Sequence, residues 1–347
     1  MKNFNLNNLL RDNIKTIKPY SSARDEYKDI TDGMLFIDAN ENPFNTNVNR
    51  YPDPQQVKLK NQLADLKGIS ENNILLGNGS DEVLDLIFRA FCEPNKDKII
   101  TLPPTYGMYA VLANINAVEN LEVPLTEDFQ PNFDEISRTA HSHTKLLFVC
   151  SPNNPTANSF DANVIEELIE EFQGIVVIDE AYIDFSKEES WLSRLNEFPN
   201  LIITQTLSKA YGLAGIRLGI CYASEDIISV LNKIKPPYNI NQLTQDKASE
   251  RLSNIEEIQN EVDIILNERE KLATELELIP LVEIVYASDA NFLLVKVDEA
   301  NKRYKQLIEK GIVVRNRTTQ PLCENCLRFT VGTTVENEKL IKTLKAI

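Results

Sequence analysis

The segment TLSKAYGLAGIRLGI (residues 206–220) combines residue types that could do covalent chemistry at a carbonyl group. Lys209 follows an apolar run, and a lysine partly removed from water has its ammonium form disfavoured, so its free amine can form an imine with an aldehyde. Thr206 and Ser208 add hydroxyl groups, and Arg217 stands where it could clamp a phosphate oxygen. An exposed lysine is the alternative, but the nearby glycines favour close backbone approach to a ligand.

A carboxylate directly follows another apolar run, Ile175 to Ile178. Burying such a carboxylate alone would cost several kcal/mol, so Asp179 needs hydrogen-bond donors or a positive partner. The protonated ring nitrogen of a cofactor is one candidate partner. A helix cap or a magnesium ligand is the other interpretation.

A glycine turn, GNGSDE (residues 77–82), precedes an amphipathic helix that we expect Ser80 to cap. Free backbone N–H groups at a helix start form an anion site, here with Gly79, Ser80 and Asp81. The turn lacks the Lys-Ser/Thr ending of an NTPase phosphate loop. Tyr106 follows a further strand, and it could stack on a planar ligand or belong to the core. Together, a reactive lysine, a carboxylate, a phosphate cradle and an aromatic ring are the parts that hold pyridoxal phosphate.

The elements that must position these residues alternate between short apolar strands and amphipathic helices from about residue 70. Strands buried on both faces imply a mostly parallel sheet flanked by helices, and functional residues gather at the carboxyl ends of such strands. After Pro236 and Pro237 a long helical stretch, about residues 241–278, leads to a compact α+β unit. We therefore expect an N-terminal arm with part of a small domain (1–48), a large α/β domain (49–237) and a small α+β domain (238–347) that both termini build.

Composition narrows the classes of function. The formal net charge of −16 argues against nucleic-acid binding, and the longest apolar runs are too short to span a membrane. The N-terminal residues follow helical spacing and predict an amphipathic arm that seeks a partner surface. Five scattered cysteines fit reduced thiols in a cytoplasm, and Cys323 and Cys326 form a lone Cys-x-x-Cys pair without the further ligands of a zinc site. We expect no metal.

The motifs resemble those of the fold-type I, class I/II aminotransferases that depend on pyridoxal phosphate, and the resemblance spans residues 18–332. It rests on KPY, ANENPF, RYPDP, GNGSDE, PPTYGMY, SPNNPT, VIDEAYIDF, TLSKAYGLAGIRLG and CLRFTVG, in the expected order. Ala157 departs from the family, which usually has glycine after NNPT, and we expect a small local backbone change there.

The resemblance implies specific roles around the cofactor. Lys209 would form the aldimine, Asp179 would pair with the ring nitrogen, Tyr182 and Asn154 would bond the phenolic oxygen, and Tyr106 would lie against the ring. The phosphate would be held by a set of backbone, hydroxyl and guanidinium groups: Gly79, Ser80, Asp81, Thr206, Ser208 and Arg217. Tyr51 would reach the cofactor phosphate of a neighbouring subunit, which implies a homodimer.

Within this family the chain is most similar to the members that act on histidinol phosphate, with glutamate reloading the amine. Arg328 would bind the α-carboxylate through a bidentate fork. Arg315 and Tyr20 would lie near the phosphate of the substrate, with Arg317 as an alternative to Arg315, and Asn40 would belong to the same substrate site. His141 and His143 are expected in a solvated loop. A decarboxylase of threonine phosphate and an aromatic amino-acid aminotransferase remain alternatives, whereas intact Lys209 and Asp179 argue against a non-catalytic cofactor-binding module.

Overall fold

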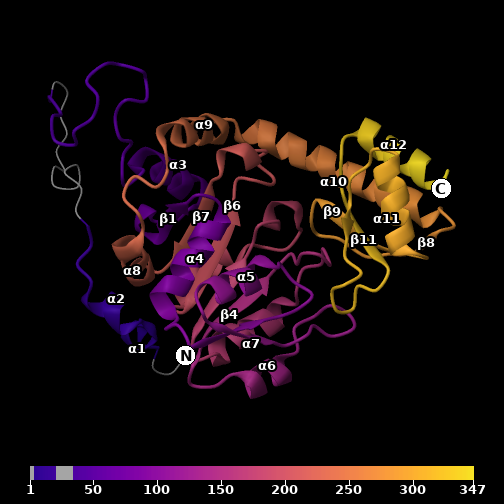
Figure 1. The fold of residues 1–347 in the computed structure, drawn as a ribbon, viewed down its shortest axis with the longest axis horizontal. Helices are drawn as coiled ribbons and strands as arrows, with labels where there is room; N and C mark the ends of the chain where they lie inside the picture. The colour runs from indigo at the N-terminus through magenta and orange to yellow at the C-terminus, as the bar shows by residue number, and fades with distance from the viewer. Residues whose placement is uncertain (1–3, 21–33) are drawn as a thin grey trace.

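The computed structural model describes residues 4–20 and 34–347, which form two sheets of unequal size (Figure 1). The large sheet has the strand order β1-β7-β6-β5-β4-β2-β3: β1 (Ile74–Gly77), β2 (Lys98–Thr101), β3 (Glu119–Glu122), β4 (Thr144–Cys150), β5 (Ile175–Asp179), β6 (Leu201–Thr206) and β7 (Gly219–Ala223). Strand β7 runs antiparallel to both of its neighbours, and the other pairs are parallel. The prediction of a large domain with a mostly parallel sheet is confirmed.

Helices cover both faces of the large sheet because successive side chains of a strand point to opposite faces. One core lies under α3 (Val57–Lys67), α6 (Phe133–Thr139), α7 (Ala162–Glu171), α9 (Gln242–Leu252) and the start of α10 (Ile255–Glu277). The other lies under α4 (Ser80–Phe91), α5 (Met108–Ile115) and α8 (Glu225–Ile234). Short 3₁₀ turns complete this part of the chain: η1 (Glu71–Asn73), η2 (Ile183–Phe185), η3 (Trp191–Glu197) and η4 (Ala214–Ile216).

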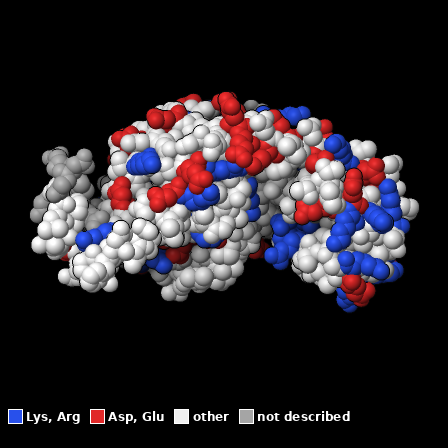
Figure 2. Space-filling model, turned by 90° about the horizontal axis from the view of Figure 1, so that it is seen from above, with Lys and Arg blue, Asp and Glu red and all other residues white. Residues whose placement is uncertain are grey.

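The small sheet lies at the far end of α10, where the chain ends (Figure 1). Its order is β10-β11-β9-β8, from β8 (Val282–Val285), β9 (Phe292–Val297), β10 (Arg315–Asn316) and β11 (Cys326–Thr330). The helices α11 (Ala300–Glu309) and α12 (Thr334–Leu344) pack on it with α10. Seen from above, this end is a lobe rich in Lys and Arg (Figure 2).

The N-terminal arm differs from our expectation. Helices α1 (Leu6–Leu9) and α2 (Asp12–Thr16) pack on the large sheet of their own chain, where Leu9, Leu10 and Ile14 are buried. Among the described residues, the core of the small sheet contains none before Ile265. The described helices of the arm therefore use their apolar face within the chain, and the contribution of residues 1–48 to the small domain stays a prediction. The domain boundaries themselves stay predictions.

Several element ends also differ from the predicted ones. Ser80 is the first residue of α4, and Gly79 takes the cap position without a side-chain hydrogen bond. The predicted helix over 241–278 is two helices, α9 and α10, separated at Ser253 and Asn254. In the part of the chain that the structure describes, no helix has the length and apolar character to cross a membrane.

Candidate active site

The carboxyl ends of β1, β4, β5 and β6 meet at one edge of the large sheet, as the parallel arrangement requires. The residues that follow these strands are thereby brought together. They are Gly79, Ser80 and Asp81 after β1, Asn154 after β4, Asp179 and Tyr182 at and after β5, and Ser208 and Lys209 after β6. Tyr106 joins them from the loop between β2 and α5. This edge is the candidate active site.

Asp179 ends β5 and is buried, with 3% of its surface exposed. Its Oδ2 accepts a hydrogen bond of 2.7 Å from the Tyr109 hydroxyl, and its Oδ1 accepts one of 3.2 Å from the backbone N–H of Ala181. Burial raises the pKa of Asp179, although these hydrogen bonds favour the charged form. Among the described residues, no Lys, Arg or His side chain forms an ion pair with Asp179, although the charge of Lys209 acts on it from a distance. The carboxylate is held in place by hydrogen-bond donors.

Lys209 lies beside Tyr182, with Nζ 5.4 Å from the centroid of the tyrosine ring. Partial burial lowers the pKa of Lys209, and the nearby positive charge of Arg328 lowers it further, against the opposing effect of Asp179. The neutral, nucleophilic form is therefore more accessible than in an ordinary surface lysine.

A chain of contacts links the large sheet to the small one at this site. Asn154 Nδ2 lies 3.5 Å from the Tyr182 hydroxyl, and Asn154 Oδ1 accepts a hydrogen bond from Nη1 of Arg328 on β11. Burial raises the pKa of Tyr182 above its ordinary range, so its hydroxyl stays protonated near neutral pH. The site lies where the two parts of the chain meet.

The turn between β1 and α4 forms a cradle with Arg217. Gly79 has a φ of 76°, its N–H donates to the Arg217 carbonyl at 3.1 Å, and a Cβ added to it would overlap the Arg217 guanidinium. A Cβ on Gly219 would overlap the backbone of Gly79 and Ser80. The first N–H groups of α4 have no partner inside the helix, so they are available as donors to an anion.

Hydroxyl groups complete this cradle. Ser208 Oγ lies 2.9 Å from Thr206 Oγ1 and 3.5 Å from Nη1 of Arg217. Tyr106 donates a hydrogen bond of 3.1 Å to Asp81, whose carboxylate lies 3.9 Å from Arg217. The arrangement offers donors and one cation to a phosphate.

Three arginines, called the arginine face below, lie close together at the small sheet. Arg315 on β10 is directly opposite Arg328 on β11. Arg317 follows the end of β10, where its N–H donates to the Cys326 carbonyl at 2.9 Å, and its charge acts on Arg328. Burial and the charge of Arg317 lower the pKa of Arg328 to about 10, so Arg328 stays charged near neutral pH. Arg317 Nε is buried and has no hydrogen-bond partner within the described chain. None of the three forms an ion pair with a described Asp or Glu side chain, so this face would gain from an anion.

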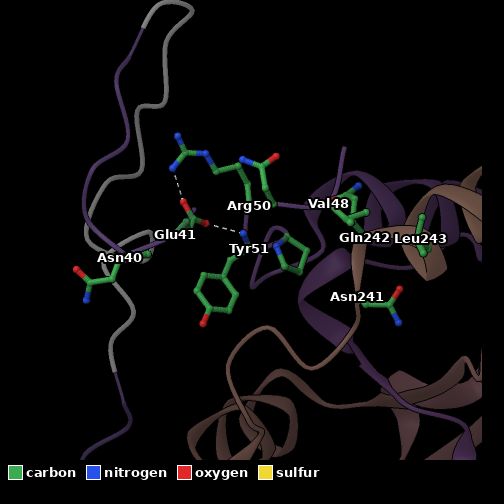
Figure 3. A pocket seen from close by; sticks show the side chains of 11 residues that line it. Asn40, Glu41, Val48, Arg50, Tyr51, Asn241, Gln242 and Leu243 are labelled. Carbon is green, nitrogen blue, oxygen red and sulfur yellow. Dashed lines mark hydrogen bonds and ion pairs between the residues drawn. The ribbon is translucent and has the colours of Figure 1, made fainter. Parts of the chain in front are cut away.

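The remaining predicted site residues lie in a second group. Tyr51 stacks on Tyr238, with ring centroids 4.6 Å apart, and its backbone N–H donates to Glu41, which also accepts from Arg50 (Figure 3). Tyr20 and Asn40 line the adjoining hollow beside Tyr51. This pocket shares no lining residue with the site around Lys209. The structure thus brings Tyr20, Asn40 and Tyr51 together but not with Lys209 of the same chain.

Two features were missed or left open by sequence reasoning. Tyr109, the donor to Asp179, was not singled out, although its spacing of three residues from Tyr106 could have indicated a shared helix face. Arg317 was held as an alternative to Arg315, and both lie on the arginine face. His141 and His143 are exposed, as expected.

At Ala157 the backbone has a φ of 70°, in the left-handed region that favours glycine. The alanine therefore adopts a conformation that is strained for a residue with a side chain.

Comparisons with known proteins identify the family to which the chain belongs. The chain belongs to the aminotransferase class I and II family, whose model matches residues 5–344. A relative from Flavobacterium johnsoniae named histidinol-phosphate aminotransferase is 64% identical over 348 residues, covering 100% of both chains. Among solved structures, the histidinol-phosphate aminotransferase from Clostridium acetobutylicum has a TM-score of 0.80 at 24% identity, covering 86% of this chain and 91% of that one. The Sinorhizobium meliloti histidinol-phosphate aminotransferase in complex with pyridoxal-5'-phosphate has a TM-score of 0.79 at 23% identity, covering 86% and 83%. These two likenesses show the fold.

Proposed function

We propose that this chain is a pyridoxal-phosphate-dependent aminotransferase that interconverts L-histidinol phosphate and 2-oxoglutarate with imidazole acetol phosphate and L-glutamate, in histidine biosynthesis. The full-length relative named for this activity supports the proposal. The structural observation that carries it is the arginine face, Arg315, Arg317 and Arg328, which has no acidic partner among the described residues and adjoins the lysine site.

The chemistry of the two substrates explains why one cationic face serves both. Histidinol phosphate has no carboxylate, and its phosphate ester sits on the carbon next to the one that carries the amine. Glutamate has its α-carboxylate at that position. An arginine fork binds either anion, so we assign Arg328 to the glutamate carboxylate and to the phosphate in turn, with Arg315, Arg317, Tyr20 and Asn40 around it.

The residues of the candidate site fit pyridoxal phosphate. A buried Asp179 that forms no ion pair within the described residues suits a protonated ring nitrogen, and the glycine turn packed against Arg217 suits a phosphate, because added side chains would fill it. The holders would be Lys209 for the aldehyde carbon, Asn154 and Tyr182 for the phenolic oxygen, Tyr106 for the ring face, and Gly79, Ser80, Asp81, Thr206, Ser208 and Arg217 for the phosphate. Bound there, pyridoxal phosphate supplies an electron-poor ring that accepts the electron pair left when the α-carbon loses its proton.

The chain supplies the rest of the chemistry. Asp179 holds a proton at the ring nitrogen through its charged form. Lys209 Nζ, with its pKa lowered, takes the proton from the substrate α-carbon. Tyr182 and Asn154 orient the site through their mutual contact, and Arg328 fixes the substrate so that the α-carbon faces the amine. The amine of the first substrate is transferred to the 2-oxo acid in a second half reaction, which predicts ping-pong kinetics.

A homodimer is part of this proposal. Tyr51 is exposed, and the hollow that it lines contains no residue of the lysine site. In a dimer, Tyr51 would reach the cofactor phosphate in the site of the second copy. The Tyr20 and Asn40 side chains beside it would then belong to the same shared site. A cytoplasmic location fits five free cysteines.

A substrate panel tests the proposal directly. Purified protein with pyridoxal phosphate is given histidinol phosphate and 2-oxoglutarate, and glutamate is measured; threonine phosphate is then supplied and carbon dioxide is measured. Phenylalanine and tyrosine with 2-oxoglutarate form the third arm. We expect kcat/KM for histidinol phosphate to exceed that for the aromatic amino acids, with no carbon dioxide.

Lys209→Ala provides the control, because it removes the amine and leaves the other residues of the site unchanged. We expect turnover to fall by at least about 1,000-fold, the scale of losing a general base and nucleophile. Release of carbon dioxide from threonine phosphate without glutamate formation would establish the decarboxylase instead. Unchanged turnover in Lys209→Ala would refute the mechanism.

A further inference from the structure

Tyr109 is buried beside the candidate site and contacts its carboxylate. It stands in the first turn of α5 with none of its surface exposed, and its hydroxyl donates a 2.7 Å hydrogen bond to Oδ2 of Asp179. Its ring stacks on Phe148, with centroids 4.8 Å apart, and meets Tyr106 edge-on at 5.5 Å. The ring is therefore held on two sides, and the hydroxyl is aimed at one carboxylate oxygen.

We propose that Tyr109 is a positioning residue that holds Asp179 in its charged form and in one orientation, so that the proton shared with the cofactor ring stays on the ring nitrogen. This inference rests on the proposed function. It adds a residue of this chain that acts through Asp179 rather than by touching substrate or cofactor.

The direction of the effect follows from the donors around Asp179. A hydrogen bond donated to a carboxylate stabilises its charged form, so each donor weakens the hold of the carboxylate on a proton. The Tyr109 hydroxyl and the Ala181 N–H donate to it, and the Thr204 hydroxyl also favours its charged form. Without the hydroxyl, the buried carboxylate would compete more strongly for the proton of the ring nitrogen, and its Oδ2 would be free to turn.

Other groups face Asp179 from every element around it. Cys150 is its neighbour on β4, Thr204 is opposite on β6, Asp81 comes from α4, and Tyr106, Tyr182 and Lys209 come from the loops of the site. Burial raises the pKa of the Cys150 thiol and of Tyr109, so both stay neutral near neutral pH. Asp81 repels a charged Asp179, which makes the donation from Tyr109 more important.

The chain offers a matched control in Tyr222. This residue on β7 is as fully buried as Tyr109, but its hydroxyl has no hydrogen-bond partner within the described residues. Tyr109→Phe and Tyr222→Phe therefore remove the same atom at the same degree of burial, and only the first removes a donor to Asp179.

The experiment loads wild type and both variants with pyridoxal phosphate labelled with 15N at the ring nitrogen and records the nitrogen resonance. In Tyr109→Phe we expect the resonance to move toward the unprotonated position, and kcat for histidinol phosphate to fall about 10- to 100-fold with KM changed less than about threefold, the scale of a hydrogen bond to a charged group. Tyr222→Phe should match wild type in both. Melting temperatures of the apoproteins show whether either variant is folded.

Two failures are distinguishable. If wild type takes up no cofactor or forms no glutamate from histidinol phosphate, the proposed function is wrong. If wild type does both, and folded Tyr109→Phe has the resonance and kcat of Tyr222→Phe, the role of Tyr109 is overturned while the proposed function stands.

Discussion

At the scale of single residues, the site holds charges that the fold alone leaves uncompensated. Arg315 and Arg328 are directly opposite on neighbouring strands, a like-charge pair that destabilises a sheet. Asp179 is a buried carboxylate that forms no ion pair among the described residues. Such arrangements persist where a ligand supplies the opposite charge. A substitution that removes one of these charges should therefore weaken ligand binding and increase the stability of the unliganded protein.

Arg328→Gln tests that trade-off. Glutamine keeps a polar group near Asn154 but loses the charged fork, so KM for both histidinol phosphate and glutamate should rise about 10- to 100-fold. Relief of repulsion from Arg315 and Arg317 should increase the free energy of unfolding of the unliganded protein by up to about 1 kcal/mol. Steady-state kinetics and urea unfolding check both parts. Arg303→Gln is the control, because Arg303 is paired with Asp298 on the same lobe and its loss should leave KM unchanged.

Lys209 gives a second prediction at this scale, in the pH dependence of cofactor uptake by the apoprotein. Its amine must be neutral to attack an aldehyde, so the rate should rise with pH through a pKa below that of an ordinary lysine, since burial and Arg328 lower it. Arg328→Gln removes a neighbouring positive charge and should move this rise to higher pH. The rate is measured by borohydride trapping followed by peptide mass analysis. A rise at the ordinary lysine pH, unmoved by Arg328→Gln, would contradict the environment described for Lys209.

At the scale of elements, β7 supports the phosphate cradle from below. It is inserted antiparallel between β1 and β6, and Gly219 at its start lies directly under the turn of Gly79 and Ser80. The close approach of two backbones requires a residue without a side chain. The anion site therefore depends on a strand that contributes no functional side chain to it.

Gly219→Ala should damage the cradle through this contact. The new methyl group would push the Gly79 turn away from Arg217, so we expect pyridoxal phosphate affinity to fall about 10-fold or more and stability to fall by about 1–3 kcal/mol, the scale of overpacking. Gly215→Ala in the same segment is the matched control, because nothing lies within 4 Å of a Cβ there. Fluorescence titration of the apoprotein and thermal unfolding measure the two effects. Equal affinity in both variants would show that the cradle tolerates displacement.

The elements also show what sequence could and could not predict. Continuous apolar runs before Asp179 and Lys209 correctly predicted buried parallel strands, and the apolar face of Val83, Leu84, Ile87, Phe88 and Phe91 is buried in α4. Strand β7 was missed because the glycines at its start and in the segment before it suggest a loop. Its pairing with β1 also depends on residues far away in the sequence. The contact between Tyr109 and Asp179 joins residues 70 positions apart, so no local pattern could reveal it. The motifs predicted which residues form the cradle, but the distances between these residues in space follow only from the tertiary structure.

At the scale of the whole molecule, the predicted site residues fall into two separate groups. Lys209, Asp179 and the arginine face lie where the large and small sheets meet. Tyr51, Tyr20 and Asn40 lie together in another hollow, beside Tyr238. If all of them serve one reaction, as we propose, the second group must complete the site of another copy, because a homodimer with twofold symmetry brings one surface of each copy to the other.

A heterodimer with two different tags tests this arrangement. One subunit carries Lys209→Ala and keeps Tyr51, and the other carries Tyr51→Phe, which keeps the ring stacked on Tyr238 but removes the hydroxyl. If Tyr51 acts on the neighbouring site, the only lysine in the pair receives an intact Tyr51 hydroxyl, and the heterodimer should show about half of the wild-type activity. The assay uses a cofactor concentration that saturates wild type but not the Tyr51→Phe homodimer. If Tyr51 acts within its own chain, the heterodimer would keep the cofactor affinity of Tyr51→Phe, and if no species carrying both tags can be purified, the shared site does not exist.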